Sequence, residues 1–263
     1  MRYKADHDYH IHSQLSSCSN NPKQTPEAIL QYAVNNKFRK ICLTDHFWGE
    51  TIPGASSWYV PQNFKHISSS KPLPQDENTE FCFGAETDMD KNCVLGISKQ
   101  RIDELRFLVI PTTHLHMKGF TVPDRLLTSE ERARLWESRF EALLNMDLPW
   151  HKIGIAHLTD SLIADSETIK EVIGLLDTEK MYTLFKKSAQ LGIGIELNFN
   201  SFALTDSNRD IMLKPYRIAK ENGCKFYLGS DAHSPEALNE AKDNFENIIK
   251  LLDLSESDKF DFE

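Results

Sequence analysis

The stretch Asp8-Tyr9-His10-Ile11-His12-Ser13 places two histidines two residues apart at the end of a short strand-like run. Side chains of a strand alternate between its two faces, so His10 and His12 point to the same side. Asp231-Ala232-His233, near the other end of the sequence, repeats this spacing. Imidazole nitrogens and carboxylate oxygens are ligands that divalent transition metals take from proteins. We therefore expect a metal site that uses residues from both ends of the sequence.

The remaining histidines and acids of this kind follow short apolar runs that predict strands. The expected strands cover 9–12, 40–44, 81–85, 107–111, 153–156, 194–198 and 225–229. Helices are expected over 25–36, 99–105, 129–145, 178–190, 209–222 and 235–252. Strands that alternate with helices predict a parallel sheet, and polar residues at the end of every strand favour a closed barrel over an open sheet. We expect an α/β fold, a TIM-like barrel in a single domain over 1–263, with its site at the C-terminal face of the strands.

Length and charge narrow the class of protein. The 263 residues fit one barrel, which typically takes about 250. No apolar run approaches the ~18 residues of a membrane span, and none forms a signal core, so we expect a cytoplasmic protein with no membrane partner. The net charge of −9 argues against nucleic acid as a partner, short oligonucleotide ends excepted. The five cysteines form no CxxC pair and are expected to be reduced. The sequence leaves the oligomeric state open.

Two segments lack the periodicity of helices and strands. Residues 47–80 predict a long loop, with a helical turn near 61–66, and loops of this length in compact domains are often functional. We expect this loop to cover the site, and its Trp48, Trp58, Tyr59 and Lys65 would suit a flat leaving group. The acidic segment 253–263 is expected to be frayed.

Together the motifs resemble those of the PHP (polymerase and histidinol phosphatase) family over nearly the whole sequence. The residues that carry the resemblance are Asp8-Tyr9-His10-Ile11-His12-Ser13, Thr44-Asp45-His46, Gly84-Ala85-Glu86, His114, His157 and Gly229-Ser230-Asp231-Ala232-His233. The resemblance implies a distorted (β/α)7 barrel with two or three divalent metal ions, zinc, manganese or iron, at its C-terminal face. The implied ligands are His10, His12, Glu86 and Asp231 for one ion, Glu86, His114 and His157 for a second, and His46, His233 and one further residue for a third.

That further residue is where this sequence departs from the family. The family commonly has a histidine six residues after His12, and here the position is Cys18. A thiolate binds zinc or iron well and manganese poorly. Either Cys18 replaces the imidazole, or the third site is weak or empty.

A site of this kind favours phosphoester hydrolysis. Two divalent ions roughly 3.5–4 Å apart can share a water and lower its pKa towards about 7, and fixed cations stabilise the charge that develops on phosphate oxygens. The expected catalytic residues are Asp45, His233 and Glu86. Asp45, His233 or a water on the third ion would protonate the leaving alkoxide, and Asp45 could instead orient His46.

Residues outside the ligand set are expected to hold the substrate. Phosphate monoesters are usually clamped by an Arg or a Lys, and the candidates are Lys118, Arg125 and Arg209. His116 and Asn198 are expected in the substrate pocket. Glu196 is expected to hydrogen-bond a ligand rather than bind metal, and His7 and His66 to lie in loops or solvent.

The function predicted from the sequence is hydrolysis of a small phosphate monoester resembling histidinol phosphate. An amidohydrolase-type barrel, which also begins with His-x-His, is a second possibility. That family usually has a metal-bridging lysine on its fourth strand, and residues 107–111 contain none. A non-catalytic metal-binding module is a third possibility.

Overall fold

The strands of the computed structural model are all parallel to their neighbours, as the alternating sequence pattern predicted. The structure describes residues 1–19, 21–198, 204, 205 and 207–262. The strands are β1 His7–Ile11, β2 Lys40–Leu43, β3 Glu80–Phe83, β4 Ala85–Glu86, β5 Leu108–Pro111, β6 Ile153–Ala156, β7 Gly194–Leu197 and β8 Lys225–Leu228. The α/β class expected from the sequence is therefore confirmed.

The strands form two sheets, where the sequence led us to expect one continuous barrel. Their orders are β1-β2-β3 and β4-β5-β6-β7-β8. The sheets meet at two isolated parallel bridges, Ile11 with Ala232 and His46 with Glu86. This arrangement is consistent with a TIM-like fold and places the C-terminal ends of all the strands on one side.

The break between the sheets falls at Gly84, inside a segment expected to be one strand. β3 pairs with β2, whereas β4 pairs with β5. A Cβ atom at Gly84 would lie 2.5 Å from the carbonyl oxygen of Phe107 and 2.7 Å from the Sγ atom of Cys42. Because only glycine lacks that atom, the chain can pass close to both neighbours here and change sheets.

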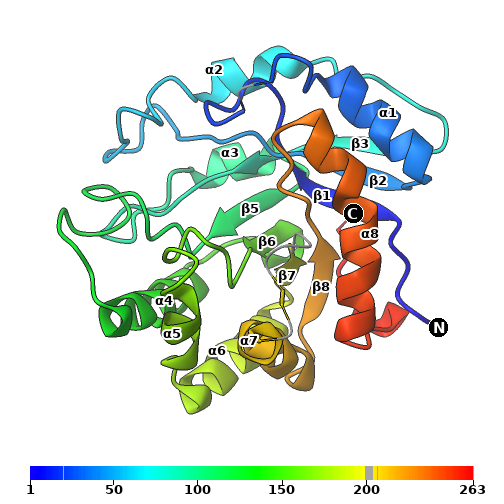
Figure 1. Cartoon of the computed structure of the whole chain (residues 1–263). Helices are drawn as coiled ribbons and strands as arrows, with labels where there is room; N and C mark the ends of the chain where they lie inside the picture. Colours follow the sequence, from blue (N-terminus) through cyan, green and yellow to red (C-terminus); the bar gives the residue numbers. More distant parts are fainter. Residues whose placement is uncertain (20, 199–203, 206, 263) are drawn as a thin grey trace.

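The helices lie outside the strands, with α4 to α7 on one side and α1 beside α8 on another (Figure 1). Their N-caps follow from the sequence: the Thr25 side chain accepts a hydrogen bond from the Ala28 N–H, and Pro26 occupies the first turn of α1. The short α5 was not expected. The helices are α1 Pro26–Asn36, α2 Phe64–Ile67, α3 Lys99–Asp103, α4 Ser129–Leu144, α5 Ile169–Gly174, α6 Thr178–Leu191, α7 Arg209–Glu221 and α8 Pro235–Leu251. Of the described residues, no helix combines the length and apolar character needed to cross a membrane.

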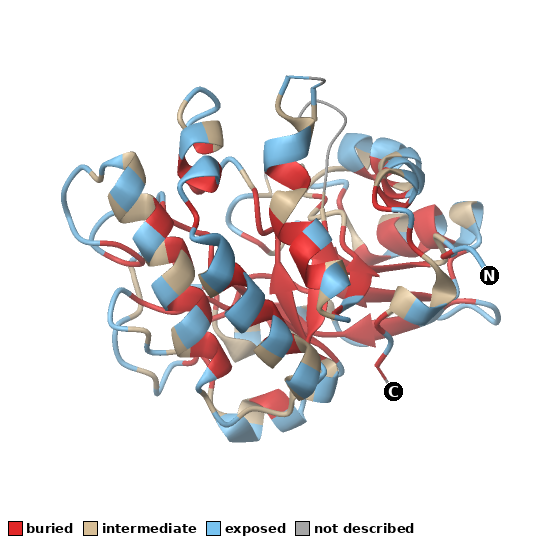
Figure 2. Ribbon diagram, turned by 90° about the horizontal axis from the view of Figure 1, so that it is seen from below, coloured by how far each residue is buried: buried red, intermediate tan, exposed pale blue. Residues whose placement is uncertain are grey.

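Two of the three clusters of buried hydrophobic side chains pack against the strands. The larger cluster packs the inner faces of the helices against the strands, as the buried faces in Figure 2 show. The smaller cluster lies in the interior that the strands surround, and both sheets contribute residues to it. Its residues are Tyr9, Cys42, Cys82, Phe107, Val109, Ala156, Tyr227, Phe260 and Phe262. The two sheets therefore enclose a common interior.

The C-terminal segment closes the N-terminal ends of the strands, so the expectation that it is frayed was wrong. Phe260 and Phe262 are buried, and the Phe260 N–H donates to the carbonyl oxygen of Phe226. Asp261 accepts hydrogen bonds from the Tyr9 hydroxyl at 2.8 Å and from the Arg39 guanidinium at 2.7 Å. The acidic composition concealed two phenylalanines at alternate positions, which is the spacing of a half-buried extended segment. Glu263 lies outside the described residues.

Candidate metal centre

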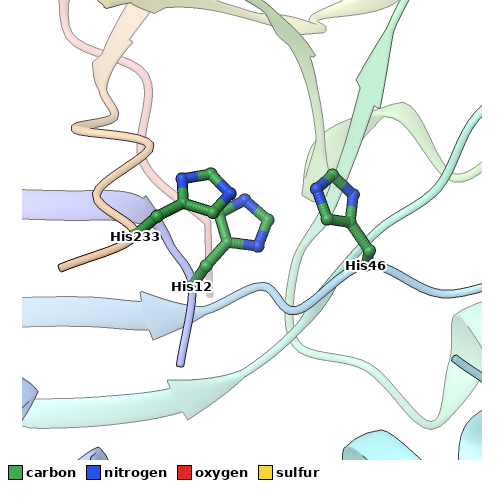
Figure 3. Close-up of side chains that lie close together, drawn as sticks. All are labelled: His12, His46 and His233. Carbon is green, nitrogen blue, oxygen red and sulfur yellow. The ribbon is translucent and has the colours of Figure 1, made fainter. Parts of the chain in front are cut away.

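Histidines and carboxylates converge at the C-terminal ends of the strands. Three groups bring their ligand atoms within 4.8 Å of one another: His10, His12, Glu86 and Asp231; Glu86, His114 and His157; and His12, His46 and His233. In the third group, the rings of His12 and His233 stack with centroids 4.1 Å apart, and His46 lies across from them (Figure 3). The folded chain thus assembles the residues predicted as ligands, Cys18 excepted. Metal ligation itself stays a prediction.

Glu86 lies at the centre of these groups. Its Oε2 atom is 3.0–3.3 Å from ring nitrogens of His10, His12 and His46. Its Oε1 atom is 3.7–3.8 Å from the Nε2 atoms of His114 and His157. Both oxygens are buried and accept no hydrogen bond among the described residues. A carboxylate with each oxygen facing a different set of imidazoles fits a bridge between two cations.

The tautomers of His10 and His12 can be deduced from their partners. Nδ1 of His10 lies 2.6 Å from a carboxylate oxygen of Glu196, which only accepts, so this nitrogen donates. Nδ1 of His12 lies 2.9 Å from the Ser16 hydroxyl. That hydroxyl donates its proton to Asp45, so His12 Nδ1 donates as well. Each ring therefore directs the lone pair of Nε2 into the cluster.

These two Nε2 atoms lie only 3.0 Å apart. Asp231 Oδ1 is 3.4 Å from one and 3.0 Å from the other. Lone pairs and carboxylate oxygens at such distances repel one another unless a proton or a cation lies between them. The donor set of imidazole and carboxylate fits a divalent transition metal.

The pKa values of these groups respond to the crowding of acceptors. Burial alone would raise the pKa of Glu86, but the charges of His46 and His10 outweigh burial and hold it well below its usual range. Burial alone would lower the pKa of His12, yet the nearby carboxylates of Asp231 and Glu86 raise it to about 9. An added proton thus takes the place of a cation at neutral pH, and metal binding releases such protons.

Three further imidazoles, those of His114, His157 and His233, are also fixed through Nδ1. Nδ1 of His114 donates to Asp88 at 2.8 Å, and Nδ1 of His157 lies 2.9 Å from the Thr113 hydroxyl. Nδ1 of His233 donates to the carbonyl oxygen of Asp231 at 2.7 Å. These contacts leave Nε2 available as the ligand atom, which is the arrangement that orients histidines in metal sites.

The backbone is strained at two residues of the ligand groups. His157 has a φ of 23° and Asp231 a φ of 52°, both in the region that favours glycine. Such conformations cost about 1–3 kcal/mol each and cluster at functional sites. Next to Asp231, Gly229 has no room for a side chain, because a Cβ atom there would lie 1.9 Å from Glu196 Oε1.

Glu196 and Asp45 both act through other side chains. The hydrogen bond expected from Glu196 is present, since it accepts from His10 and from the backbone N–H of His157 at 2.7 Å. Asp45 accepts hydrogen bonds from the Ser13 N–H, the Ser13 hydroxyl and the Ser16 hydroxyl. Asp45 is buried and is not among the described residues that line the cavity. Its contacts favour a role in orienting His12 over the catalytic role expected from the sequence.

Cys18 lies at the cavity wall, outside the three groups. Cys18 is an exposed residue that lines the cavity with its sulfur partly shielded from solvent, and the sulfur belongs to no ligand group among the described residues. Desolvation raises the pKa of this thiol to about 12, and the charges of Glu86 and Asp231 contribute. A protonated thiol is a weak ligand. His12 occupies the place in the third group that the sequence suggested for Cys18.

A cavity of about 660 Å³ opens over the cluster. His116 and Lys118, expected to contact substrate, line it, as do Glu86, His46 and His233. Asn198 lines a smaller neighbouring cavity of about 240 Å³ instead.

The other two expected phosphate clamps lie elsewhere. Arg125 is on the surface and pairs with Glu131 at 2.7 Å. Arg209 begins α7. Neither is among the described residues that line the two cavities.

The 47–80 segment forms one wall of the larger cavity. Trp58 lines the cavity and lies against His46 with ring centroids 4.9 Å apart. Trp48 and Tyr59 are buried behind it and pack with Phe120. Lys65 is exposed and is not among the described residues that line the cavity.

Sequence reasoning missed several residues of the centre. Asp88 and Ser16 hydrogen-bond histidines that are predicted to be ligands, and Asp160 forms a fourth group with His157 and Asp231. Asp88 could have been found, because it lies two residues after Glu86 and alternation predicts a similar direction. Ser16 and Asp160 lie in loops and carry no such signal. His7 was expected near solvent but is buried, and its Nε2 accepts from the Leu228 N–H.

The fold is shared with a solved histidinol phosphate phosphatase from Lactococcus lactis subsp. lactis Il1403, a structure that contains zinc, L-histidinol and phosphate. The TM-score is 0.62 at 17% sequence identity, covering 97% of this chain and 98% of that chain. A Xaa-Pro dipeptidase with bound methionine in its active site aligns with a TM-score of 0.31 and 13% identity, over 97% of this chain and 78% of that chain, which is too low to indicate a common fold. No protein-family model and no curated protein sequence matches the chain.

Proposed function

We propose that this protein is a metal-dependent phosphoesterase of the PHP type that hydrolyses a small phosphate monoester resembling histidinol phosphate. The observation that carries the proposal is Glu86, a buried carboxylate without hydrogen bonds whose two oxygens face separate imidazole groups. The shared fold with a histidinol phosphate phosphatase supports the choice of reaction.

The proposed ligands follow the three groups of the structure. His10, His12, Glu86 and Asp231 would hold one ion, and Glu86, His114 and His157 a second. His46 and His233 would contribute to a third, weaker site, because His12 already belongs to the first group. When bound, divalent ions such as zinc, manganese or iron supply positive charge for the phosphate oxygens and lower the pKa of a coordinated water.

Neighbouring residues set the orientation and the protonation of the histidines in this centre. Asp45 directs the proton of Ser16, which fixes the tautomer of His12. Burial and the charge of His12 lower the pKa of His233, so His233 offers a lone pair rather than a proton at neutral pH. We therefore propose that His233 is a metal ligand rather than the proton donor to the leaving group.

The cavity wall indicates how a substrate would be held. Lys118 is the one lysine or arginine among the described residues that line the cavity, and it can pair with a phosphate oxygen. Trp58, Met117, Phe120 and Leu162 form an apolar surface that fits the carbon skeleton of a small leaving group.

Phosphate release tests the proposal. The protein, reconstituted with Zn²⁺, Mn²⁺ or Fe²⁺, would be assayed with histidinol phosphate, other small phosphate monoesters and a set of amide substrates. We expect hydrolysis of monoesters that Glu86→Gln abolishes and Glu80→Gln, a change of an exposed glutamate, leaves intact. Turnover of amides but not of any monoester would contradict the proposal and favour an amidohydrolase.

A further inference from the structure

Two consecutive residues of the 47–80 segment serve different parts of the site. Trp58 lines the cavity and contacts the ring of His46. Tyr59 is fully buried and is not among the described cavity-lining residues. Their rings are nearly perpendicular, at 89°, with centroids 4.7 Å apart. One short stretch therefore connects the substrate cavity with the interior behind the histidines.

The Tyr59 hydroxyl reaches the support of a proposed metal ligand. It donates to Asp88 Oδ2 at 2.8 Å, and the same oxygen accepts from His114 Nδ1 at 2.8 Å. Asp88 is fully buried. The hydroxyl also lies 3.5 Å from Nδ1 of His46, a member of another ligand group. Tyr59 thus touches the surroundings of two groups at once.

Packing determines where this hydroxyl lies. The Tyr59 ring packs against Trp48 and Phe120, with centroids 5.7 and 5.4 Å away. A buried ring held on several sides has little freedom to withdraw its hydroxyl. The donor to Asp88 is therefore fixed by the aromatic cluster.

Arg139 holds the loops that carry Asp88 and His114. This guanidinium is buried and donates to the backbone carbonyl oxygens of Met89, Asp90, Thr112 and Thr121. The loops after β4 and β5 are thereby fastened to α4. Both ends of the hydrogen-bond chain from Tyr59 through Asp88 to His114 are thus anchored.

We propose that Tyr59 is a positioning residue of the metal centre, acting through Asp88 to keep the proton of His114 on Nδ1 and its Nε2 directed at the second metal site. The proposal rests on the metal centre of the proposed function and extends it. Because Tyr59 belongs to the segment that forms the cavity wall, substrate contact at Trp58 and metal affinity at His114 depend on the same few residues. Hydrogen-bond partners of metal-bound histidines typically contribute about 10–100-fold in metal affinity.

The test compares two tyrosines that each donate to a carboxylate at 2.8 Å from a fully buried ring. Tyr59→Phe removes the donor to Asp88, whereas the control Tyr9→Phe removes the donor to Asp261 at the opposite end of the strands. Zn²⁺ affinity would be measured by equilibrium competition with a chromophoric chelator, and the coordination of Co²⁺ by its absorption spectrum. Circular dichroism would verify that each variant is folded.

We expect Tyr59→Phe to weaken binding of one ion about 10-fold and to alter the Co²⁺ spectrum, with no such effect of Tyr9→Phe. Asp88→Asn should weaken binding more, about 100-fold, because its amide can donate to Nδ1 and move the proton of His114 to Nε2. Equal affinities for the wild type and Tyr59→Phe, or equal losses for both tyrosine variants, would overturn the proposal. Since these readouts need no substrate, a wild type that binds metal but releases no phosphate would refute the proposed function alone.

Discussion

The two ends of the strands hold carboxylates in different states: Asp261 at the N-terminal ends is partly exposed, whereas Glu86 at the C-terminal ends is buried. At the N-terminal ends, Asp261 is paired directly with Tyr9 and Arg39. At the C-terminal ends, the oxygens of Glu86 accept no hydrogen bond among the described residues, and the Nε2 atoms of His10 and His12 lie 3.0 Å apart. A paired carboxylate needs no further partner, whereas acceptors that face one another need a proton or a cation between them.

This contrast separates stability from function. Changes at the N-terminal ends should lower the free energy of unfolding and leave metal binding intact. Changes to the side chains of the ligand groups at the C-terminal ends should instead weaken metal binding and leave the free energy of unfolding intact or higher, since the protein already tolerates unsatisfied groups and a strained backbone there.

The largest effect is expected for Glu86→Gln. The amide loses the charge that faces both imidazole groups, so metal content should fall and phosphate release should drop about 10³-fold or more. Elemental analysis and initial rates would measure these losses. A variant with full metal content would show that Glu86 is not the bridge.

Phe260→Ala should lower the stability of the fold and leave metal binding unchanged. Truncating this buried ring leaves a cavity beside Tyr227 and Gly194, which should lower the free energy of unfolding by about 3–5 kcal/mol. Denaturant unfolding of the metal-free protein would measure the change. An unaltered number of metal ions per folded chain is expected, and loss of metal at full stability would reverse the contrast between the two ends.

Gly229→Ala should combine both effects on a smaller scale. The new Cβ atom would overlap Glu196 Oε1 and displace the carboxylate that fixes His10. We expect Zn²⁺ affinity to fall about 10–100-fold and stability by about 1–3 kcal/mol. The matched control is Gly174→Ala, because nothing lies within 4 Å of a Cβ atom there. Equal metal affinity in the two variants would contradict the role given to Glu196.

The smallest effect is expected for Cys18→Ala. Its thiol lines the cavity but belongs to no ligand group among the described residues, so metal content and Zn²⁺ affinity should stay unchanged. Loss of one ion per chain in this variant would show that the thiol moves into the third group on binding.

Local sequence patterns predicted the strand ends and the convergence of their histidines, because those signals depend on alternation and on parallel topology. The strand expected over 81–85 is interrupted at Gly84. The reason is visible only in the structure, where Phe107 and Cys42 lie too close to this position for any side chain. The packing of Phe260 was hidden by the acidic residues around it.

The supports of the ligands depend on contacts between residues distant in sequence. Asp45 was expected to protonate the leaving group or to orient His46, and its hydrogen bonds to Ser13 and Ser16 favour instead a role in orienting the loop and His12. The pairing of Tyr59 with Asp88 joins a loop to a strand end across 29 positions. No local periodicity carries that information.

Elemental analysis of the wild-type protein, after reconstitution with Zn²⁺ and removal of loosely bound metal, tests the central claim most directly. The two groups that share Glu86 predict at least two tightly bound ions per chain, and partial filling of a third site. A folded protein that retains no ion would contradict the account, because protons alone would then satisfy the acceptors around Glu86.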